Sequence, residues 1–226
     1  MRAQICTKIG IMAQTYSLHS TTPQTRTIDT IVHALRSGAV MLYPTDTVYA
    51  IGCDLNSKTA VQRVRQIKSM ANDKPLTFLC PSLSDIAQYA QVTDSAYRLM
   101  RKLVPGPYTF VLPTTKLVPK LVLSPKRKTT GIRVPQHEIC LALMHQLGNP
   151  IISTSAYALA LEEELEPPHL ADSRFELFDC YEKIVDIIID SDRDPSGQFS
   201  TVIDFTNEPP EMIRRGRDWE KVEAML

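Results

Sequence analysis

Apolar and polar residues along the chain follow two periods, one typical of helices and the other typical of strands. A helical period begins near Thr27, which we predict to be the N-cap, and ends at Gly38. The apolar positions of this helix recur every three or four residues: Ile28, Ile31, Val32 and Leu35. A second helix is predicted from the N-cap Ser57 to about Met70, with Lys68 at the edge of its buried face.

Short apolar runs between turn residues predict the strands of a sheet. They fall at residues 39–43, 76–80, 108–112, 130–134, 150–152, 184–189, 200–205 and 212–215. Further helices are predicted at residues 82–89, 94–103, 136–147 and 219–225, and an acidic connector at 158–178. Because strands are interleaved with helices, we expect an α/β fold. The late strands follow one another through short connections, which favours a mixed sheet over a purely parallel one.

The length of 226 residues predicts one domain with a short appended segment. Residues 1–26 contain three basic residues, many Ser and Thr and no acid, so we expect a poorly ordered N-terminal extension before a single domain at 27–226. No apolar run approaches the ~20 residues that a membrane-spanning helix needs. Five scattered cysteines without a CxxC pair predict reduced thiols and a cytoplasmic protein. The histidines show no metal-ligand spacing.

The net charge of zero conceals a strong asymmetry along the chain. Residues 58–133 contain fourteen Lys and Arg against three acids, a net charge of +11, whereas residues 135–226 contain seven against nineteen, a net charge of −12. The basic segment suggests an anionic ligand. The alternative, that the two segments neutralise each other across one surface, stays open at this point.

The segment Tyr43-Pro44-Thr45-Asp46-Thr47 follows a buried strand directly. Pro44 stops strand pairing, and the next three residues offer hydroxyl, carboxylate and backbone amide groups at the end of a rigid element, as in many sites for small polar ligands. The same residue types also form ordinary turns. The segment alone therefore does not distinguish a binding site from a turn.

Hydroxyl and cationic side chains recur at other predicted element ends. The full set is Thr45, Thr47, Lys68, Lys74, Thr109, Arg133, Ser153, Thr154, Ser155, Ser200 and Arg214. Hydroxyl groups together with Lys and Arg suit phosphate oxygens, through charge-assisted hydrogen bonds. No nucleophile–histidine–acid grouping stands out, and GxGxxG and GxxxxGK[ST] are both absent. The pattern favours phosphate binding over covalent catalysis.

Several motifs in a fixed order carry a family resemblance. They are residues 43–49 (YPTDTVY), 52–54 (GCD), 67–68 (IK), 73–76 (DKPL), 105–110 (PGPYTF), 126–135 (KRKTTGIRVP), 152–156 (ISTSA), 200–204 (STVID) and 213–216 (IRRG). With these motifs the chain resembles the threonylcarbamoyl-AMP synthase family (YrdC/TsaC), with its closest likeness to the YciO branch. The resemblance runs from about Met12 to the C-terminus.

The resemblance implies a twisted mixed α/β sheet with flanking helices and a positively charged concave face. It also implies an activity: L-threonine, bicarbonate and ATP give L-threonylcarbamoyladenylate and pyrophosphate, in a step linked to t6A modification of tRNA. Such a step needs positioning and charge neutralisation more than a nucleophilic side chain. Mg²⁺ is expected on the ATP phosphates.

By motif, the resemblance assigns roles to individual residues. Thr45 and Thr47 contact the threonine substrate, and Lys74 takes a further substrate-side position. Lys68, the expected catalytic residue, touches the nucleotide phosphate or the carbamate. The remaining assignments are the pocket-lining Thr109 and Arg133, the adenylate-binding Ser153 and Ser155, and the closing residues Ser200 and Arg214.

Two positions depart from the synthase pattern. Met70 stands where the synthases carry the arginine of a Lys-x-Arg pair, and Tyr157 stands where they carry an asparagine. Arg63 lies two helical turns from Met70, about 10 Å away, and is a poor substitute. These departures predict weak synthase activity.

Two other functions stay open. One is a module that binds double-stranded RNA or tRNA through its basic segment, including Lys126, Arg127 and Lys128. The other is a hydrolase that breaks down the adenylate, because a site that lacks one cation can admit water.

Overall fold

The computed structural model describes residues 12–68, 76–119, 122, 128–156, 173–194 and 196–226. Within them, ten strands form a single mixed sheet that seven helices flank, as expected from the sequence. In sheet order the strands are β1 (Gln14–Ser17), β8 (Ile187–Asp190), β2 (Val40–Tyr43), β3 (Ala50–Asp54), β7 (Ile151–Ser155), β4 (Thr77–Leu79), β6 (Thr129–Arg133), β5 (Tyr108–Pro113), β9 (Thr201–Asp204) and β10 (Glu211–Arg214). In the same residues no helix combines the length and apolar character that crossing a bilayer requires.

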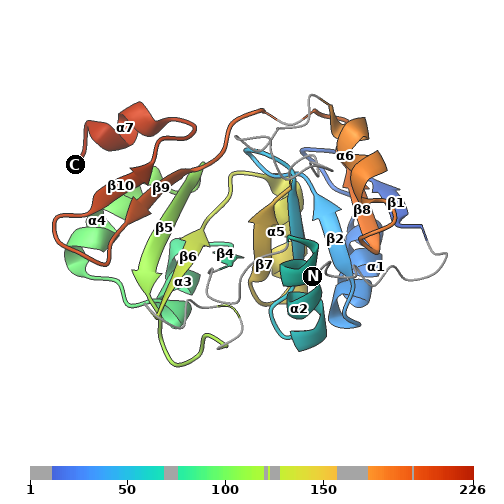
Figure 1. The fold of residues 1–226 in the computed structure, drawn as a ribbon, viewed down its shortest axis with the longest axis horizontal. Coiled ribbons are helices and arrows are strands. Elements are labelled where there is room, and N and C mark those ends of the chain that lie inside the picture. The colour runs from blue at the N-terminus through green and yellow to red at the C-terminus, as the bar shows by residue number, and fades with distance from the viewer. Residues whose placement is uncertain (1–11, 69–75, 120–121, 123–127, 157–172, 195) are drawn as a thin grey trace, which may run out of the picture.

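The strand directions confirm the mixed sheet. The β1–β8, β8–β2, β4–β6 and β5–β9 pairs are parallel, and the other five pairs are antiparallel. Figure 1 shows the sheet from β10 and β9 at one end to β1 at the other. The first and last strands of the chain therefore form the two opposite edges of the sheet.

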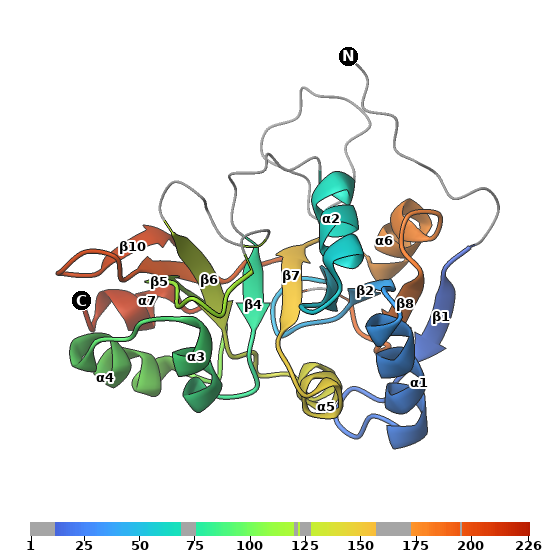
Figure 2. The same cartoon turned by 90° about the horizontal axis from the view of Figure 1, so that it is seen from below.

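Helices cover both faces of the sheet, and in Figure 2 helices lie both above and below its β2–β7 part. The helices are α1 (Thr25–Arg36), α2 (Lys58–Ile67), α3 (Leu83–Tyr89), α4 (Asp94–Leu103), α5 (Glu138–Leu147), α6 (Arg174–Tyr181) and α7 (Trp219–Glu223). Apolar residues of α1 and α5 pack together on one face. The other helices bury their apolar residues in a larger cluster on the opposite face.

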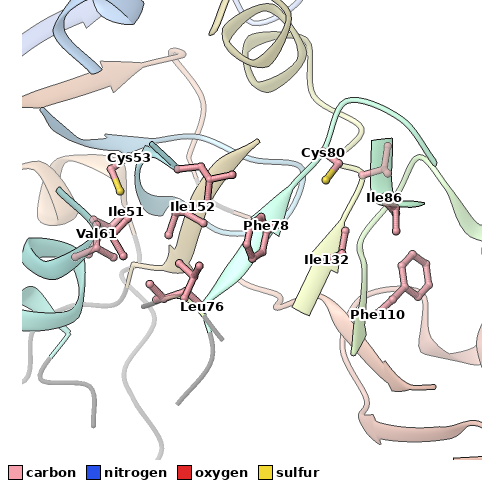
Figure 3. Close-up of a cluster of buried hydrophobic side chains, with 14 of the residues drawn as sticks. Ile51, Cys53, Val61, Leu76, Phe78, Cys80, Ile86, Phe110, Ile132 and Ile152 are labelled. Atoms are coloured by element: carbon pink, nitrogen blue, oxygen red, sulfur yellow. The ribbon is translucent and has the colours of Figure 1, made fainter. Parts of the chain in front are cut away.

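The larger cluster is the main hydrophobic core, and Figure 3 shows part of it. Phe78, Phe110, Ile132 and Ile152 come from neighbouring central strands and are completely buried. Side chains alternate between the two faces of a strand. The residues next to these four in sequence therefore point to the other face, where the candidate site lies.

Local sequence signals explain several element boundaries. The Ser57 hydroxyl accepts a hydrogen bond from the Ala60 amide at 3.3 Å, which confirms the predicted N-cap of α2. Gly148 ends α5 in the left-handed conformation, at φ 78°. The prediction that Thr27 caps the first helix is wrong, because α1 begins at Thr25 after Gln24, which makes no side-chain cap.

Three elements were not predicted. β1 lies inside the predicted N-terminal extension, β3 directly follows the Tyr43–Thr47 segment, and α6 begins inside the predicted acidic connector. Residues 1–11 and 157–172 lie outside the described residues. The division of the chain at residues 26 and 27 remains a prediction.

Candidate ligand-binding site

A cavity of about 390 Å³ opens on the sheet face that also carries α1 and α5. The strand residues in its wall alternate with the residues of the main core. Thr77, Thr109, Gly131 and Ser153 line the cavity, whereas their neighbours Phe78, Phe110, Ile132 and Ile152 face the core. The central strands therefore build a hydrophobic core on one side and a polar cavity on the other.

Nine of the residues predicted from the sequence line this one cavity. They are Thr45, Thr47, Thr109, Arg133, Ser153, Thr154, Ser155, Ser200 and Arg214. They come from β5, β6, β7, β10 and the segments next to β2 and β9. Residues that are up to 169 positions apart, from Thr45 to Arg214, thus meet at one place because the sheet order brings their strands together.

The segment that begins at Pro44 forms one end of the cavity and is held by its own hydroxyl groups. Thr45 Oγ1 donates to the Val48 carbonyl at 2.7 Å and accepts from the Thr47 amide at 3.1 Å. Thr45 Oγ1 also lies 3.1 Å from Thr47 Oγ1. Since a small network fixes both hydroxyls, they present a defined polar surface to a ligand.

Arg133 extends from the end of β6 toward this segment. Its Nη1 donates to Thr47 Oγ1 at 2.9 Å, and its Nη2 donates to Asp46 Oδ1 at 2.5 Å. The guanidinium is buried, and its Nε has no hydrogen-bond partner among the described residues. A buried donor without a partner is costly in free energy, so Nε is available to a ligand oxygen.

A second polar network lies at the other end of the cavity. Thr109 Oγ1 lies 2.8 Å from Ser200 Oγ, and Arg214 Nη2 donates to the same Ser200 oxygen at 2.9 Å. Arg214 Nε donates to the Ser200 carbonyl at 3.0 Å, and its guanidinium lies 5.4 Å from the centre of the Phe199 ring. Arg214 therefore stands at the cavity in a fixed orientation.

Tyr43 does not line the cavity itself but holds one of its wall residues, Ser153. Its hydroxyl donates to Ser153 Oγ at 2.7 Å, and burial raises the pKa of this phenol well above its usual value. The ring passes close to Gly52, where an added Cβ would come within 2.7 Å of it. Only glycine leaves room for the ring, so Tyr43 can orient the Ser153 hydroxyl.

Comparison with known proteins places the chain in a family. The Sua5/YciO/YrdC family model, whose description reads "Telomere recombination", matches residues 33–216. The chain belongs to this family. YciO of Escherichia coli K12, which is named as an uncharacterized protein, is 39% identical over 206 residues and covers 91% of this chain and 96% of its own. The threonylcarbamoyl-AMP synthase of Pyrococcus abyssi is 33% identical over 183 residues, which are 80% of this chain but 52% of the synthase.

Solved structures of this YrdC/Sua5 family share the fold. The crystal structure of E. coli YciO matches with a TM-score of 0.82 and 38% identity, over 91% of this chain and 97% of that chain. The crystal structure of P. abyssi Sua5 complexed with L-threonine matches with a TM-score of 0.81 and 27% identity, over 94% of this chain and 60% of that chain. The expected YrdC-like architecture is thereby confirmed.

Other predicted site residues fall elsewhere. Lys68 forms the C-cap of α2, is not among the residues that line the cavity, and has a pKa that burial lowers to about 8. Lys128 is exposed, with φ 51°. Five further residues named in the sequence analysis lie outside the described residues: Met70, Lys74, Lys126, Arg127 and Tyr157. The site roles of Lys68, Lys74 and Lys128 remain predictions.

The structure adds site residues that sequence reasoning missed. Asp46 holds Arg133, Tyr43 holds Ser153, and Thr77 and Gly131 line the middle of the cavity. Asp46 and Tyr43 belong to the segment that the sequence analysis identified as a candidate site. Their location was therefore predictable from the sequence, but their partners, Arg133 and Ser153, were not. Thr77 and Gly131 lie inside predicted strands and show no comparable signal.

The donor set of the cavity suits an anion. Arg133 and Arg214 are the only charged residues among the described residues of its wall, and the other polar groups are mainly Thr and Ser hydroxyls. No group of three or more His, Cys, Asp or Glu side chains within the described residues could hold a metal ion. The positive charge predicted for the whole concave face remains a prediction.

Proposed function

We propose that the chain binds L-threonine and an adenine nucleotide in this cavity and forms or processes L-threonylcarbamoyladenylate. The observation that carries the proposal is the meeting of Thr45, Thr47, Arg133, Ser200 and Arg214 in one cavity. Two arginines and several fixed hydroxyls match the carboxylate and phosphate oxygens of such ligands. The likeness to a Sua5 structure complexed with L-threonine supports the threonine half of the proposal.

The two ends of the cavity take different parts of the substrates. Thr45 and Thr47 hold the threonine, while Arg133 receives its carboxylate through the unpartnered Nε. Ser153 and Ser155 hold the adenylate, and Ser200 and Arg214 close over it. Lys68 acts as the catalytic residue by touching the nucleotide phosphate or the carbamate, and Lys74, outside the described residues, takes a further substrate-side position.

In the proposed reaction, threonine and bicarbonate first give the carbamate and water, and one oxygen of the carbamate then attacks the α-phosphorus of ATP. The bond to the bridging oxygen breaks, and pyrophosphate leaves. The protein contributes fixed donors toward the developing charge rather than a nucleophile. Since no described wall residue is a carboxylate, we place Mg²⁺ on the phosphates, where it would neutralise their charge.

Weak turnover is part of the proposal. Met70 replaces a cation of the synthase pattern, and the loss of one such group costs ~2–4 kcal/mol of transition-state stabilisation. Arg63 does not compensate, because its Nη1 is engaged with Asp186 at 2.5 Å. Tyr157 cannot both donate and accept as an asparagine amide does.

Pyrophosphate release from ATP tests the proposal. We expect slow release that rises with both L-threonine and bicarbonate, and faster release in the Met70→Arg, Tyr157→Asn double variant. Complementation of a strain that lacks its synthase should improve in parallel. If the unaltered chain and the double variant both bind nucleotide but show no threonine-dependent turnover, the synthase proposal is wrong. Incubation of the chain with L-threonylcarbamoyladenylate then tests the hydrolase alternative, which predicts that the adenylate is broken down.

Binding of double-stranded RNA or tRNA is the second candidate function. On α4, Arg98, Arg101 and Lys102 are all exposed, in the segment of highest positive charge. Phosphate contacts release counterions, so affinity should fall steeply between 50 and 200 mM salt. A titration with a short RNA duplex at low salt measures this, and an absence of binding there removes the candidate.

A further inference from the structure

A second cavity, of about 410 Å³, lies against the first one and shares Thr45 and Thr47 with it. None of its other wall residues belongs to the predicted site. Its charged and titratable wall residues come from four different segments: Asp46, Tyr49, His137, Arg193, Asp194, Arg217 and Asp218. The Pro44–Thr47 segment thus forms a wall between two polar cavities.

Two buried polar atoms of this second cavity have no partner among the described residues. They are Asp46 Oδ2 and His137 Nδ1. The Asp46 side chain is only 10% exposed, and its other oxygen is occupied by Arg133. A buried carboxylate oxygen without a donor is unfavourable, so Oδ2 requires a donor from outside the described residues, and a ligand can supply it.

Two guanidinium groups supply the opposite charge. Arg193 is exposed and makes no hydrogen bond or ion pair within the described residues. Arg217 donates through Nη1 to the Asp46 carbonyl at 2.7 Å, which leaves its other N–H groups for a ligand. The wall therefore offers an acceptor at Asp46 and cationic donors at Arg193 and Arg217.

The remaining charges narrow the class of ligand. Asp194 is occupied by Arg174, whose backbone amide donates to it at 3.0 Å, and Asp218 is exposed. Two further carboxylates disfavour a polyphosphate, since like charges repel. The described residues here do not form a metal-binding group of three or more ligands. A ligand with one positive and one negative group fits best.

We propose that the second cavity binds a free α-amino acid. Its ammonium group donates to Asp46 Oδ2, and its carboxylate accepts hydrogen bonds from Arg193 and Arg217. Charge-assisted hydrogen bonds at both ends of a zwitterion give orientation as well as affinity. The three residues that contact this ligand, Asp46, Arg193 and Arg217, have no role in the proposed synthase reaction, so the site does not depend on that reaction, although Thr45 and Thr47 line both cavities.

Calorimetric titration of the full chain with each protein α-amino acid in turn tests the site. We expect at least one of them to bind, and its methyl ester and its N-acetyl form to bind at least tenfold more weakly, because each lacks one charge. Arg193→Gln should weaken the binding roughly tenfold, since it removes a charge-assisted contact. Arg193 is exposed and unpaired, so this variant should fold normally.

Two control variants separate the cavities. Ser200→Ala changes only the first cavity, and Arg215→Gln changes neither cavity. In both variants the affinity of the second cavity for the amino acid should therefore stay within twofold of that of the unaltered chain. L-threonine should show two binding events if both proposals hold, of which Arg193→Gln removes one. Binding of no amino acid would overturn the second site. A loss in Ser200→Ala that equals or exceeds the loss in Arg193→Gln would also overturn it, because the ligand then lies in the first cavity.

Discussion

Asp46 and Arg133 form a buried ion pair, with Arg133 Nη2 2.5 Å from Asp46 Oδ1 and side chains that are 10% and 8% exposed. The two residues are 87 positions apart in the chain. Since Arg133 also donates to Thr47, its guanidinium is fixed by two residues of the segment that separates the two cavities. The pair therefore connects the stability of the fold to the shape of the candidate site.

Asp46→Asn should destabilise the protein clearly. The change leaves the Arg133 charge buried without a counterion, and breaking such a pair costs about 3 kcal/mol or more. The free energy of unfolding, from urea denaturation, measures the loss. Glu223→Gln is the matched control: it breaks the exposed pair with Arg215, and such surface pairs contribute less than about 1 kcal/mol. Equal losses in the two variants would contradict the assigned role of the buried pair.

Arg214 and Arg215 are neighbours in sequence with different predicted effects on nucleotide binding. Arg214 lines the first cavity, whereas Arg215 donates to Glu223 at 2.7 Å and lies over the Trp219 ring. Arg214→Met should weaken ATP binding at least about tenfold, because a charge-assisted contact is worth about 1.5–3 kcal/mol. Arg215→Met should change it less than twofold. Equilibrium dialysis measures both, and a similar loss in both variants would show that only net charge matters.

Lys68 should make stability depend on pH in the alkaline range. Burial lowers its pKa from 10.5 to about 8 in the folded state. Between these values the unfolded chain binds more protons, so stability rises with pH. Compared with Lys68→Met, the unaltered chain should therefore gain stability between about pH 8 and 10.5. Lys58→Met, at an exposed lysine of the same helix, is the control. A constant difference between the chain and Lys68→Met across this range would refute the shift.

Alanine substitutions at two glycines should have different effects, one on nucleotide binding and the other on stability. At Gly131 an added Cβ would lie 3.1 Å from Thr77 Oγ1 and 3.2 Å from Thr109 Cγ2, inside the first cavity. Gly131→Ala should therefore reduce nucleotide affinity several-fold.

Gly148 has φ 78° and no atom within 4 Å of an added Cβ. Gly148→Ala should lower the unfolding free energy by about 1 kcal/mol, through backbone strain alone, which corresponds to roughly 2–4 °C in Tm. Calorimetry measures the stability of both variants, and titration measures the affinity. Unchanged nucleotide affinity in Gly131→Ala, with a loss of affinity in Gly148→Ala, would show that the ligand does not occupy the space at Gly131.

Elements with a clear apolar pattern were predictable, and three without one were not. β1 is a mostly exposed edge strand of polar residues, so no buried face marks it. β3 is buried along its whole length and contains Gly52, which resembles a turn more than a strand. In α6 the apolar residues are spread around the helix instead of gathering on one side of it. These elements depend on contacts with distant parts of the chain.

The candidate site was predictable in its residue types but not in its pairings. Hydroxyls and arginines at strand ends indicated a phosphate site, and the cavity brings nine of them together. The ion pair between Asp46 and Arg133 follows from the strand order, which local patterns do not determine. The same holds for the hydrogen bond from Arg217 to the Asp46 carbonyl, across 171 positions.

The parallel pairing of β1 with β8 also affects the order in which the chain folds during synthesis. Gln14 pairs with Ile187, so the first strand has no partner until 173 more residues have been made. At ribosomal rates of about 5–20 residues per second, this takes roughly 9–35 s. The α1 and β2 segments emerge in the meantime, and β2 can pair with β3 at once. One edge of the sheet is therefore completed late, by the first strand that left the ribosome.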